Sequence, residues 1–127
     1  MLRREDILRR FAELPLDPER CWLTAGAALV LHGLRTETRD LDIGCTSSLA
    51  DELERAGYPA ERDSDGSRRF ALAPDADLSE NFGQGFTQRM DGVNVVSLYD
   101  ILLLKRKLGR EKDRADIDAL ERRLGLR

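Results

Sequence analysis

The feature that most constrains this chain is the segment from Trp22 to Cys45, in which an apolar run leads to two acidic residues one position apart. Residues 21–24 (CWLT) predict a short buried strand. The following GAALVLHG, which begins at Gly26, is rich in helix-forming Ala and Leu and predicts a helix that ends at Gly33. The segment therefore predicts a strand that leads directly into a helix.

The two acids belong to a second predicted strand. Leu41 and Ile43 alternate with Asp40 and Asp42, which is typical of a strand with one buried face. Side chains at positions i and i+2 of a strand point to the same face. We therefore expect the carboxylates of Asp40 and Asp42 to lie side by side.

Two carboxylates at such close range repel each other, so a cation is expected between them. Oxygen ligands in this arrangement suit Mg²⁺ or Mn²⁺, which take one or two protein carboxylates and complete their shell with water and substrate phosphates. The alternative is that Asp40 and Asp42 are solvated, or paired with Arg35 and Arg39. An isolated Asp-x-Asp pattern recurs by chance and does not decide between these interpretations.

Gly26 adds a second element to the hypothesis. It stands where the strand passes into the helix, where backbone N–H groups of a first helical turn can face an anion, and a residue without a side chain lets a phosphate approach the backbone. A phosphate-binding turn next to a metal-binding pair is what transfer of a nucleotidyl group from a triphosphate requires.

The rest of the chain predicts helices and strands in mixed order. They are a helix over residues 5–14, a helix from Ser48 to Gly57 opened by a Ser48–Asp51 capping box, a hairpin of residues 58–62 and 68–72, a strand near 76–79, a loop over 81–91, a strand over 93–96, a helix begun by Ser97 and a last amphipathic helix that ends at Gly125. This pattern predicts a single α/β (α+β) domain over residues 1–127, with a mixed sheet flanked by helices and a C-terminal helical pair.

Composition narrows the functional classes. The 127 residues carry a net charge of −3, so no overall positive field would hold nucleic acid or an anionic membrane surface. The charged N-terminus lacks a signal peptide and no apolar run is long enough to span a membrane, which predicts a cytoplasmic protein without a membrane partner. Cys21 and Cys45 are expected to be reduced, buried thiols.

The stretch TAGAALVLHGLRTETRDLDI resembles the first motif of the minimal nucleotidyltransferase superfamily, in which a Gly-Gly or Gly-Ser pair opens a helix and two Asp follow. The LHG stretch with Arg35 and Thr38 ahead of the acids resembles the AbiE-type toxin branch more closely. The C-terminal segment LYDILLLKRKLGREKDRADIDAL is similar to a second motif of that branch, with Lys105 followed by an Arg-x-Lys-Asp-x-x-Asp pattern that ends at Asp116.

The resemblance implies a nucleotidyltransferase-like fold, an NTP substrate, and Mg²⁺ or Mn²⁺ held by Asp40, Asp42 and a third carboxylate from a neighbouring strand. Asp77 is the candidate for this third position and Asp75 competes with it. It further implies a nucleotide site, formed by Ala25, Gly26, Arg35, Thr38 and Lys105.

The reaction that the resemblance implies is transfer of a nucleoside monophosphate to a hydroxyl of an RNA, a protein or a small molecule. The AbiE-like motifs add a toxin–antitoxin or phage-defence context with a cognate toxin or antitoxin protein as partner. Ala25 replaces the first Gly of the family pair. This departure leaves open an alternative, a catalytically degenerate nucleotidyltransferase-like module that binds or regulates.

Several other polar and aromatic residues have a structural interpretation. Asp113 and Asp116 are expected to cap the last helix. Phe82 and Phe86 are expected to be core anchors, with base stacking as the alternative. Residues 68–69 (two Arg) are expected on a solvated strand face, with contact to a nucleic-acid acceptor as the alternative.

Overall fold

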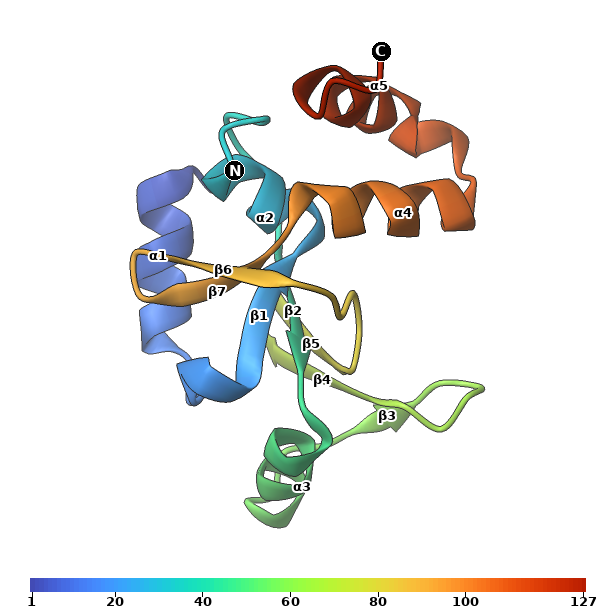
Figure 1. The fold of residues 1–127 in the computed structure, drawn as a ribbon. Coiled ribbons are helices and arrows are strands. Elements are labelled where there is room, and N and C mark those ends of the chain that lie inside the picture. The colour runs from blue at the N-terminus through green and yellow to red at the C-terminus, as the bar shows by residue number, and fades with distance from the viewer.

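Seven strands form one mixed sheet at the centre of the computed structural model, which describes residues 1–127 (Figure 1). The strands are β1 (Cys21–Thr24), β2 (Leu41–Cys45), β3 (Glu61–Arg62), β4 (Arg68–Ala73), β5 (Ala76–Glu80), β6 (Thr87–Met90) and β7 (Val93–Val96), in the order β3-β4-β5-β2-β1-β7-β6. The pairs β2–β5 and β1–β7 are parallel, and the other four pairs are antiparallel. The predicted α/β class with a mixed sheet is confirmed.

Five helices accompany the sheet: α1 (Arg4–Glu13), α2 (Ala25–Leu31), α3 (Ser47–Arg55), α4 (Leu98–Leu108) and α5 (Arg114–Arg123). Helix α2 packs against β1, β2 and β7, and α1 packs on α2. Helices α4 and α5 contact each other at the C-terminal end of the chain, as Figure 1 shows, which confirms the C-terminal helical pair. No helix in this fold combines the length and the apolarity that a membrane span requires.

Alternation along β2 and β5 separates the core from the polar face of the sheet. Leu41, Ile43 and Leu78 are fully buried, whereas Asp42 and Asp77 lie on the other face, because successive strand residues point to opposite sides. The hydrophobic positions thus fix which face of the sheet carries the acids.

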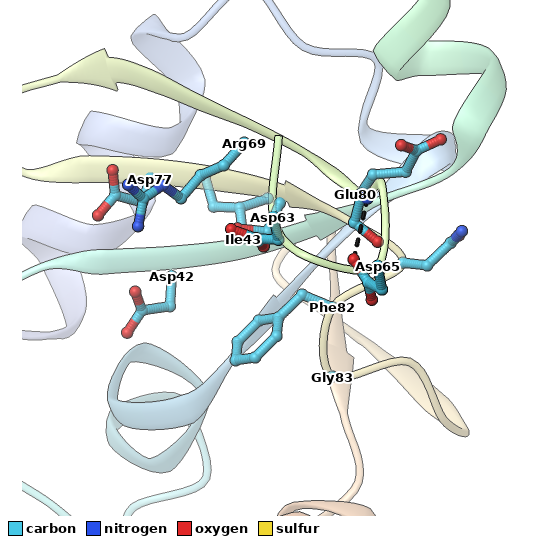
Figure 2. Close-up of a pocket in the computed structure, with 12 residues that line it drawn as sticks. Asp42, Ile43, Asp63, Asp65, Arg69, Asp77, Glu80, Phe82 and Gly83 are labelled. Atoms are coloured by element: carbon cyan, nitrogen blue, oxygen red, sulfur yellow. Dashed lines mark hydrogen bonds between the residues drawn. The ribbon is translucent and has the colours of Figure 1, made fainter. Parts of the chain in front are cut away.

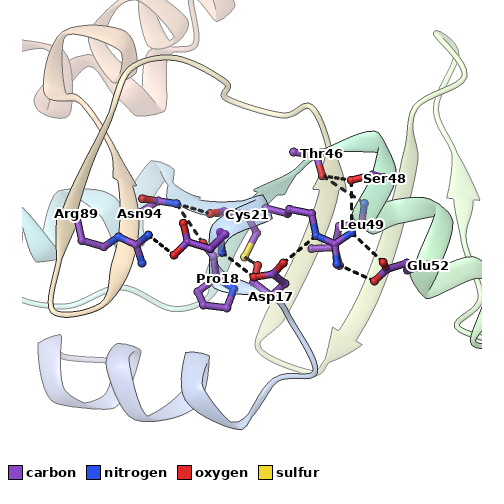
Figure 3. Close-up of polar contacts among 11 residues, drawn as sticks. Asp17, Pro18, Cys21, Thr46, Ser48, Leu49, Glu52, Arg89 and Asn94 are labelled. Carbon is purple, nitrogen blue, oxygen red and sulfur yellow. Dashed lines mark hydrogen bonds and ion pairs between the residues drawn. The ribbon is translucent and has the colours of Figure 1, made fainter.

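Polar contacts fasten the turn before β1 to distant parts of the chain (Figure 3). The guanidinium of Arg20 donates to Asp17 and, at 2.7 and 3.0 Å, to both carboxylate oxygens of Glu52 in α3. The amide of Asn94 in β7 donates to the carbonyl of Pro18 at 3.1 Å. These contacts hold β1 in place between its neighbours β2 and β7.

The two cysteines face each other across the β1–β2 pair, and both thiols are free and buried. Burial raises the pKa of the Cys21 thiol to about 12 and that of the Cys45 thiol to about 11. Both are therefore neutral thiols at physiological pH, as expected from the sequence.

Two local predictions are wrong. Helix α3 starts at Ser47 with Thr46 as its cap, whose hydroxyl accepts from the Leu49 N–H, so Ser48 and Asp51 form no capping box. The predicted loop over 81–91 contains strand β6, which pairs with β7 as a hairpin at the sheet edge. An edge strand with exposed polar residues lacks the alternation of apolar and polar residues that reveals a strand in a sequence.

Candidate functional site

Asp42 and Asp77 lie next to each other on adjacent strands. The parallel register of β2 and β5 makes them direct partners, and Figure 2 shows both side chains projecting from this part of the sheet. Asp75 does not reach them, because its carboxylate is bound by Arg10 of α1, with hydrogen bonds of 2.7 and 3.0 Å. Of the two competing aspartates, the structure therefore brings Asp77 to Asp42.

Asp40 precedes β2 and lies close enough to Asp42 to act on it electrostatically. Burial raises the pKa of the Asp42 carboxyl above its ordinary value, and the negative charges of Asp40 and Asp77 raise it further, whereas the positive charges of Lys105 and Arg110 oppose this rise. The carboxyl group at the centre of this cluster therefore holds its proton more tightly than a free aspartate does.

These acids fit a divalent cation only in part. No three His, Cys, Asp or Glu side chains gather closely enough to form a metal site by themselves. Hard cations such as Mg²⁺ commonly use one or two carboxylates and take their other oxygens from water and phosphates. Asp42 with Asp40 or Asp77 offers this partial set of carboxylate ligands.

A cavity of about 600 Å³ opens on one side of Asp42. It is lined by residues from both ends of the chain, including Ala25, Gly26, Arg35, Thr38, Arg39, Asp40, Asp42, Lys105, Arg110, Lys112, Asp113 and Asp116. All five residues of the predicted nucleotide site belong to this lining. Its cationic side chains lie beside the acids, an arrangement that suits a metal-bound polyphosphate.

Lys105 enters this cavity from α4 as a nearly buried cation, with 7% of its surface exposed. Its ammonium donates to Asp113 at 2.9 Å and lies 3.4 Å from the Asp116 carboxylate, which is also 4.0 Å from the guanidinium of Arg35. Arg110 binds the other oxygen of Asp113 at 2.6 Å. The aspartates thus fix the position of the cavity cations.

The prediction that Asp113 and Asp116 cap the last helix is wrong for Asp113. Asp113 occupies the N-cap position of α5, but its side chain makes no capping hydrogen bond. Burial opposes ionisation of this carboxyl, yet the hydrogen bonds from Arg110 and Lys105 outweigh it and hold its pKa below the ordinary value. The carboxylate remains charged because two cations bind it.

Ala25, the first residue of α2, has a φ of +52°. This left-handed conformation costs a residue with a side chain about 1–2 kcal/mol, and glycine adopts it freely. The chain therefore retains the backbone geometry of a glycine position while carrying alanine, at a point that lines the larger cavity.

We expect Ala25→Gly to stabilise the protein by about 0.5–1 kcal/mol, because the relief of backbone strain exceeds the entropy that glycine adds to the unfolded chain. Ala27→Gly is the matched control: Ala27 is fully buried in the same helix and has no positive φ, so this change should destabilise by about 1 kcal/mol or more. Urea unfolding followed by circular dichroism measures both. A loss of stability in Ala25→Gly would contradict the assignment of strain.

Two side chains lie over Gly26, the residue expected to let a phosphate approach the backbone. Gly26 is buried, and a Cβ placed on it would lie 2.4 Å from the Thr38 hydroxyl and 3.0 Å from the Arg35 guanidinium. Backbone hydrogen bonds with Leu2 hold Thr38 there. The space that the missing side chain leaves is therefore filled by two other residues of the predicted nucleotide site.

A second cavity, of about 460 Å³, lies on the other side of Asp42 (Figure 2). It was not expected from the sequence, and its lining is Asp42, Ile43, Asp63, Asp65, Ser67, Arg69, Asp77, Ser79, Glu80, Asn81, Phe82 and Gly83. The alternation of Asp77 and Ser79 along β5 was the one sequence signal for its floor. The β3–β4 turn adds Asp63, Asp65 and Ser67 to the lining, and only the folded chain brings this turn next to Asp42.

Phe82 and Phe86 are not the core anchors that the sequence suggested. Phe82 is 39% exposed and Phe86 is 84% exposed. Phe82 and Asp42 both line the two cavities, so the ring stands where the cavities meet. Figure 2 shows the ring beside Asp42.

This chain has a nucleotidyltransferase-like fold. It is similar to the crystal structure of a "putative nucleotidyltransferase" from Thermotoga maritima, with a TM-score of 0.55 over 97% of this chain and 91% of that chain. The two sequences are 16% identical, and this likeness concerns the fold alone. No protein-family model matches the sequence, and no curated protein matches it.

Proposed function

We propose that this protein is a Mg²⁺-dependent nucleotidyltransferase that moves a nucleoside monophosphate from an NTP to a hydroxyl group. One observation carries the proposal: Asp42, flanked by Asp40 and Asp77, lies where a cation-lined cavity meets a second cavity. One cavity is available for each substrate, and the carboxylates lie between them. A nucleotidyltransferase-like fold agrees with this reading.

Each group has a role that follows from its surroundings. Asp42 with Asp40 would hold a divalent cation, which when bound neutralises phosphate charge and orients the triphosphate. Lys105 and Arg35 would bind phosphate oxygens. Their positions are set by the Asp113 and Asp116 carboxylates, so little reorganisation is needed when the nucleotide arrives.

Asp77 would accept the proton of the attacking hydroxyl. It is exposed on β5 and faces the smaller cavity, so an acceptor can reach it, whereas Asp42 is half-buried. A general base must lie within hydrogen-bonding reach of the proton that it takes. Asp77 would meet this condition for an acceptor in the smaller cavity, with the nucleotide in the larger cavity on the other side of Asp42.

The AbiE-like branch and a toxin–antitoxin role in the cytoplasm are finer parts of this proposal. They are supported by the motif of Lys105 and the Arg-x-Lys-Asp-x-x-Asp pattern. The five residues that define this motif line the cavity of the proposed nucleotide site: Lys105, Arg110, Lys112, Asp113 and Asp116. A cognate toxin or antitoxin protein would then be the macromolecular partner.

The second candidate is a degenerate module that binds a nucleotide or regulates a partner without turnover. Two observations favour it: Ala25 holds a strained conformation at the family's glycine position, and Thr38 covers Gly26. This candidate predicts nucleotide binding without release of pyrophosphate.

Isothermal titration of the protein with each of the four ribonucleoside triphosphates, with and without Mg²⁺, tests the proposal. We expect Mg²⁺-dependent binding that Asp42→Ala abolishes and that Asp118→Asn, a change outside both cavities, leaves unaltered. Pyrophosphate release with an acceptor present separates the enzyme from the degenerate module. Absence of binding at millimolar nucleotide would refute both candidates.

A further inference from the structure

We propose that the smaller cavity is the acceptor site and that it takes a small alcohol carrying protonated amines, not RNA. This inference rests on the proposed function, because the acceptor must meet a nucleotide held in the larger cavity. The smaller cavity has a volume of about 460 Å³, within the range of small-molecule sites. It shares Asp42 and Phe82 with the larger one, so its occupant would lie beside the reacting phosphate.

The charge of the lining selects a cation. Asp42, Asp63, Asp65 and Asp77 have no ion-pair partner within 4.0 Å. The cavity's other two charged residues are already engaged: Glu80 binds Arg68 at 2.8 Å, and Arg69 binds Glu61 at 2.6 Å. The charge of Arg69 also acts on Asp77 and Asp63, but the lining holds five carboxylates and one guanidinium and therefore stays negative. Nucleic-acid phosphates would be repelled by this lining, whereas a protonated amine would be attracted.

The aspartates of the β3–β4 turn are kept in place for this role. The Asp65 carboxylate accepts the Ser67 N–H at 2.9 Å, and this bond holds the pKa of Asp65 below its ordinary value. The Asp63 backbone pairs with Ser67 and Gly66. The turn therefore holds the Asp65 carboxylate in its charged form and fixes the backbone that carries Asp63 at the same cavity.

An independent observation points to a polar ligand at the same junction. The Thr24 side chain is 1% exposed, and its hydroxyl is the one buried side-chain polar atom without a hydrogen-bond partner. Thr24 is the cross-strand partner of Asp42, so both side chains lie on the same face of the sheet. An unpaired buried hydroxyl costs stability and calls for an explanation.

Gly83 shows where that hydroxyl is aimed. A Cβ placed on Gly83 would lie 2.5 Å from the Thr24 oxygen, so the hydroxyl points at the Gly83 backbone, which forms part of the cavity wall. Thr24 itself does not line the cavity, because its hydroxyl lies behind the Gly83 backbone. A hydroxyl-bearing ligand at this wall would become its partner when the Gly83 backbone moves aside. The alcohol function of the acceptor is such a group.

The proposed step is balanced as follows. The acceptor oxygen forms a bond to the α-phosphorus, and the bond from that phosphorus to the oxygen that bridges it to the β-phosphorus breaks. The bridging oxygen keeps the electron pair and leaves as part of pyrophosphate. The hydroxyl proton passes to the carboxylate of Asp77, and the amines of the acceptor stay protonated against Asp63 and Asp65.

The first test compares two acceptors of the same size. Pyrophosphate release is measured with the full chain, the NTP that binds best and Mg²⁺, in the presence of 1,3-diamino-2-propanol, glycerol or a short RNA oligonucleotide. We expect the diamine to be at least about tenfold better than glycerol and RNA to be inactive, with an advantage that shrinks at high salt. Equal rates with glycerol, a preference for RNA, or bound nucleotide with no active acceptor would overturn the inference.

The second test uses variants of the cavity wall. Asp63→Asn with Asp65→Asn should raise the KM for the diamine about tenfold and leave the KM for the NTP unchanged, because neither residue lines the larger cavity. Thr24→Val should weaken the acceptor reaction although it removes an unpaired polar atom, and Thr24→Ser should restore it. If Thr24 has only a structural role, the KM for the acceptor does not change in Thr24→Val.

The two proposals fail in different ways. If no NTP binds, both the proposed function and the proposed acceptor site are refuted. If NTP binding depends on Asp42 and pyrophosphate release needs RNA, the nucleotidyltransferase stands and only the cationic acceptor is refuted.

Discussion

The Asp42→Asn variant is expected to lose catalysis and to gain stability. Removing the carboxylate between Asp40 and Asp77 should lower NTP- and acceptor-dependent pyrophosphate release by about 10²–10³-fold or more, the loss that follows when one preorganised charge-stabilising group is removed. The same change removes a half-buried negative charge next to two others. We expect a gain of about 0.5–2 kcal/mol in unfolding free energy, the usual exchange between stability and activity at such sites.

The sign of the stability effect follows from the pKa of Asp42. Burial and the two neighbouring carboxylates raise this pKa in the folded state, so the folded protein binds the proton more tightly than the unfolded chain does. This contribution is fully present below the ordinary pKa of 3.8 and is lost as the pH rises through the raised value. The advantage of Asp42→Asn should therefore be seen at neutral pH and disappear in acid.

Thermal unfolding with EDTA at several pH values, together with a pyrophosphate assay, measures both effects. Asp118→Asn, which lies outside the cavities, serves as the control and should change neither quantity appreciably. Addition of Mg²⁺ and NTP should stabilise the wild type and not the Asp42 variant. A variant less stable than the wild type at neutral pH would show that the acids do not repel each other.

Arg68→Met is expected to be the most destabilising of these single changes. Arg68 is 8% exposed and lies on the helix-covered face of β4, where it donates two hydrogen bonds to Glu80, at 2.8 and 3.0 Å, and binds Asp51 and Glu54 of α3. The expectation that this arginine is solvated is therefore wrong. Removing the guanidinium leaves the Glu80 carboxylate without a compensating positive charge. We expect this to lower the free energy of unfolding by about 3–5 kcal/mol.

The pH dependence of stability should report the same interaction. Hydrogen bonds from Arg68 lower the pKa of Glu80 from 4.5 to about 2. A depressed folded-state pKa stabilises the protein above the unfolded value, and this contribution is lost as the pH falls from about 4.5 towards about 2. Wild-type stability should fall across this window, and Arg68→Met should lack the part of the fall that Glu80 causes.

The neighbouring arginine provides the control. Arg69 projects from the opposite face of the same strand, is exposed, and pairs with the exposed Glu61. Arg69→Met should change stability by less than about 1 kcal/mol, as is usual for surface ion pairs. Urea unfolding of the two variants from pH 2.5 to 7 compares them, and similar losses in both would argue against a special role for the buried pair.

Much of the local structure could be predicted from the sequence. The alternation of Leu41 and Ile43 with Asp42 identified both the strand and its polar face, and the short apolar strand before Ala25 identified the start of α2. Such signals lie within a few residues, because strand and helix periods are local properties of the chain. The edge strand β6 was not predicted, because it buries too little apolar surface to produce an alternating pattern in the sequence.

Part of the candidate site could also be inferred, through a resemblance and not through periodicity. Ala25, Arg35 and Lys105 were assigned to a nucleotide site from family motifs, and the structure places all three in the lining of one cavity. Their catalytic and binding roles stay predictions. The cover that Thr38 forms over Gly26 could not be foreseen, because it depends on how residues 34–40 fold back across the helix start.

The amino-acid sequence by itself determined the order of the elements other than β6, and the face of β2 and β5 that carries their acids, because these depend on the spacing of neighbouring side chains. The tertiary structure alone decided that Asp77 and not Asp75 meets Asp42, that Asp113 binds Lys105 and Arg110, and that Thr24 is buried without a partner. These outcomes depend on strand register and helix packing between distant segments, where burial and charge act between residues that no local pattern connects.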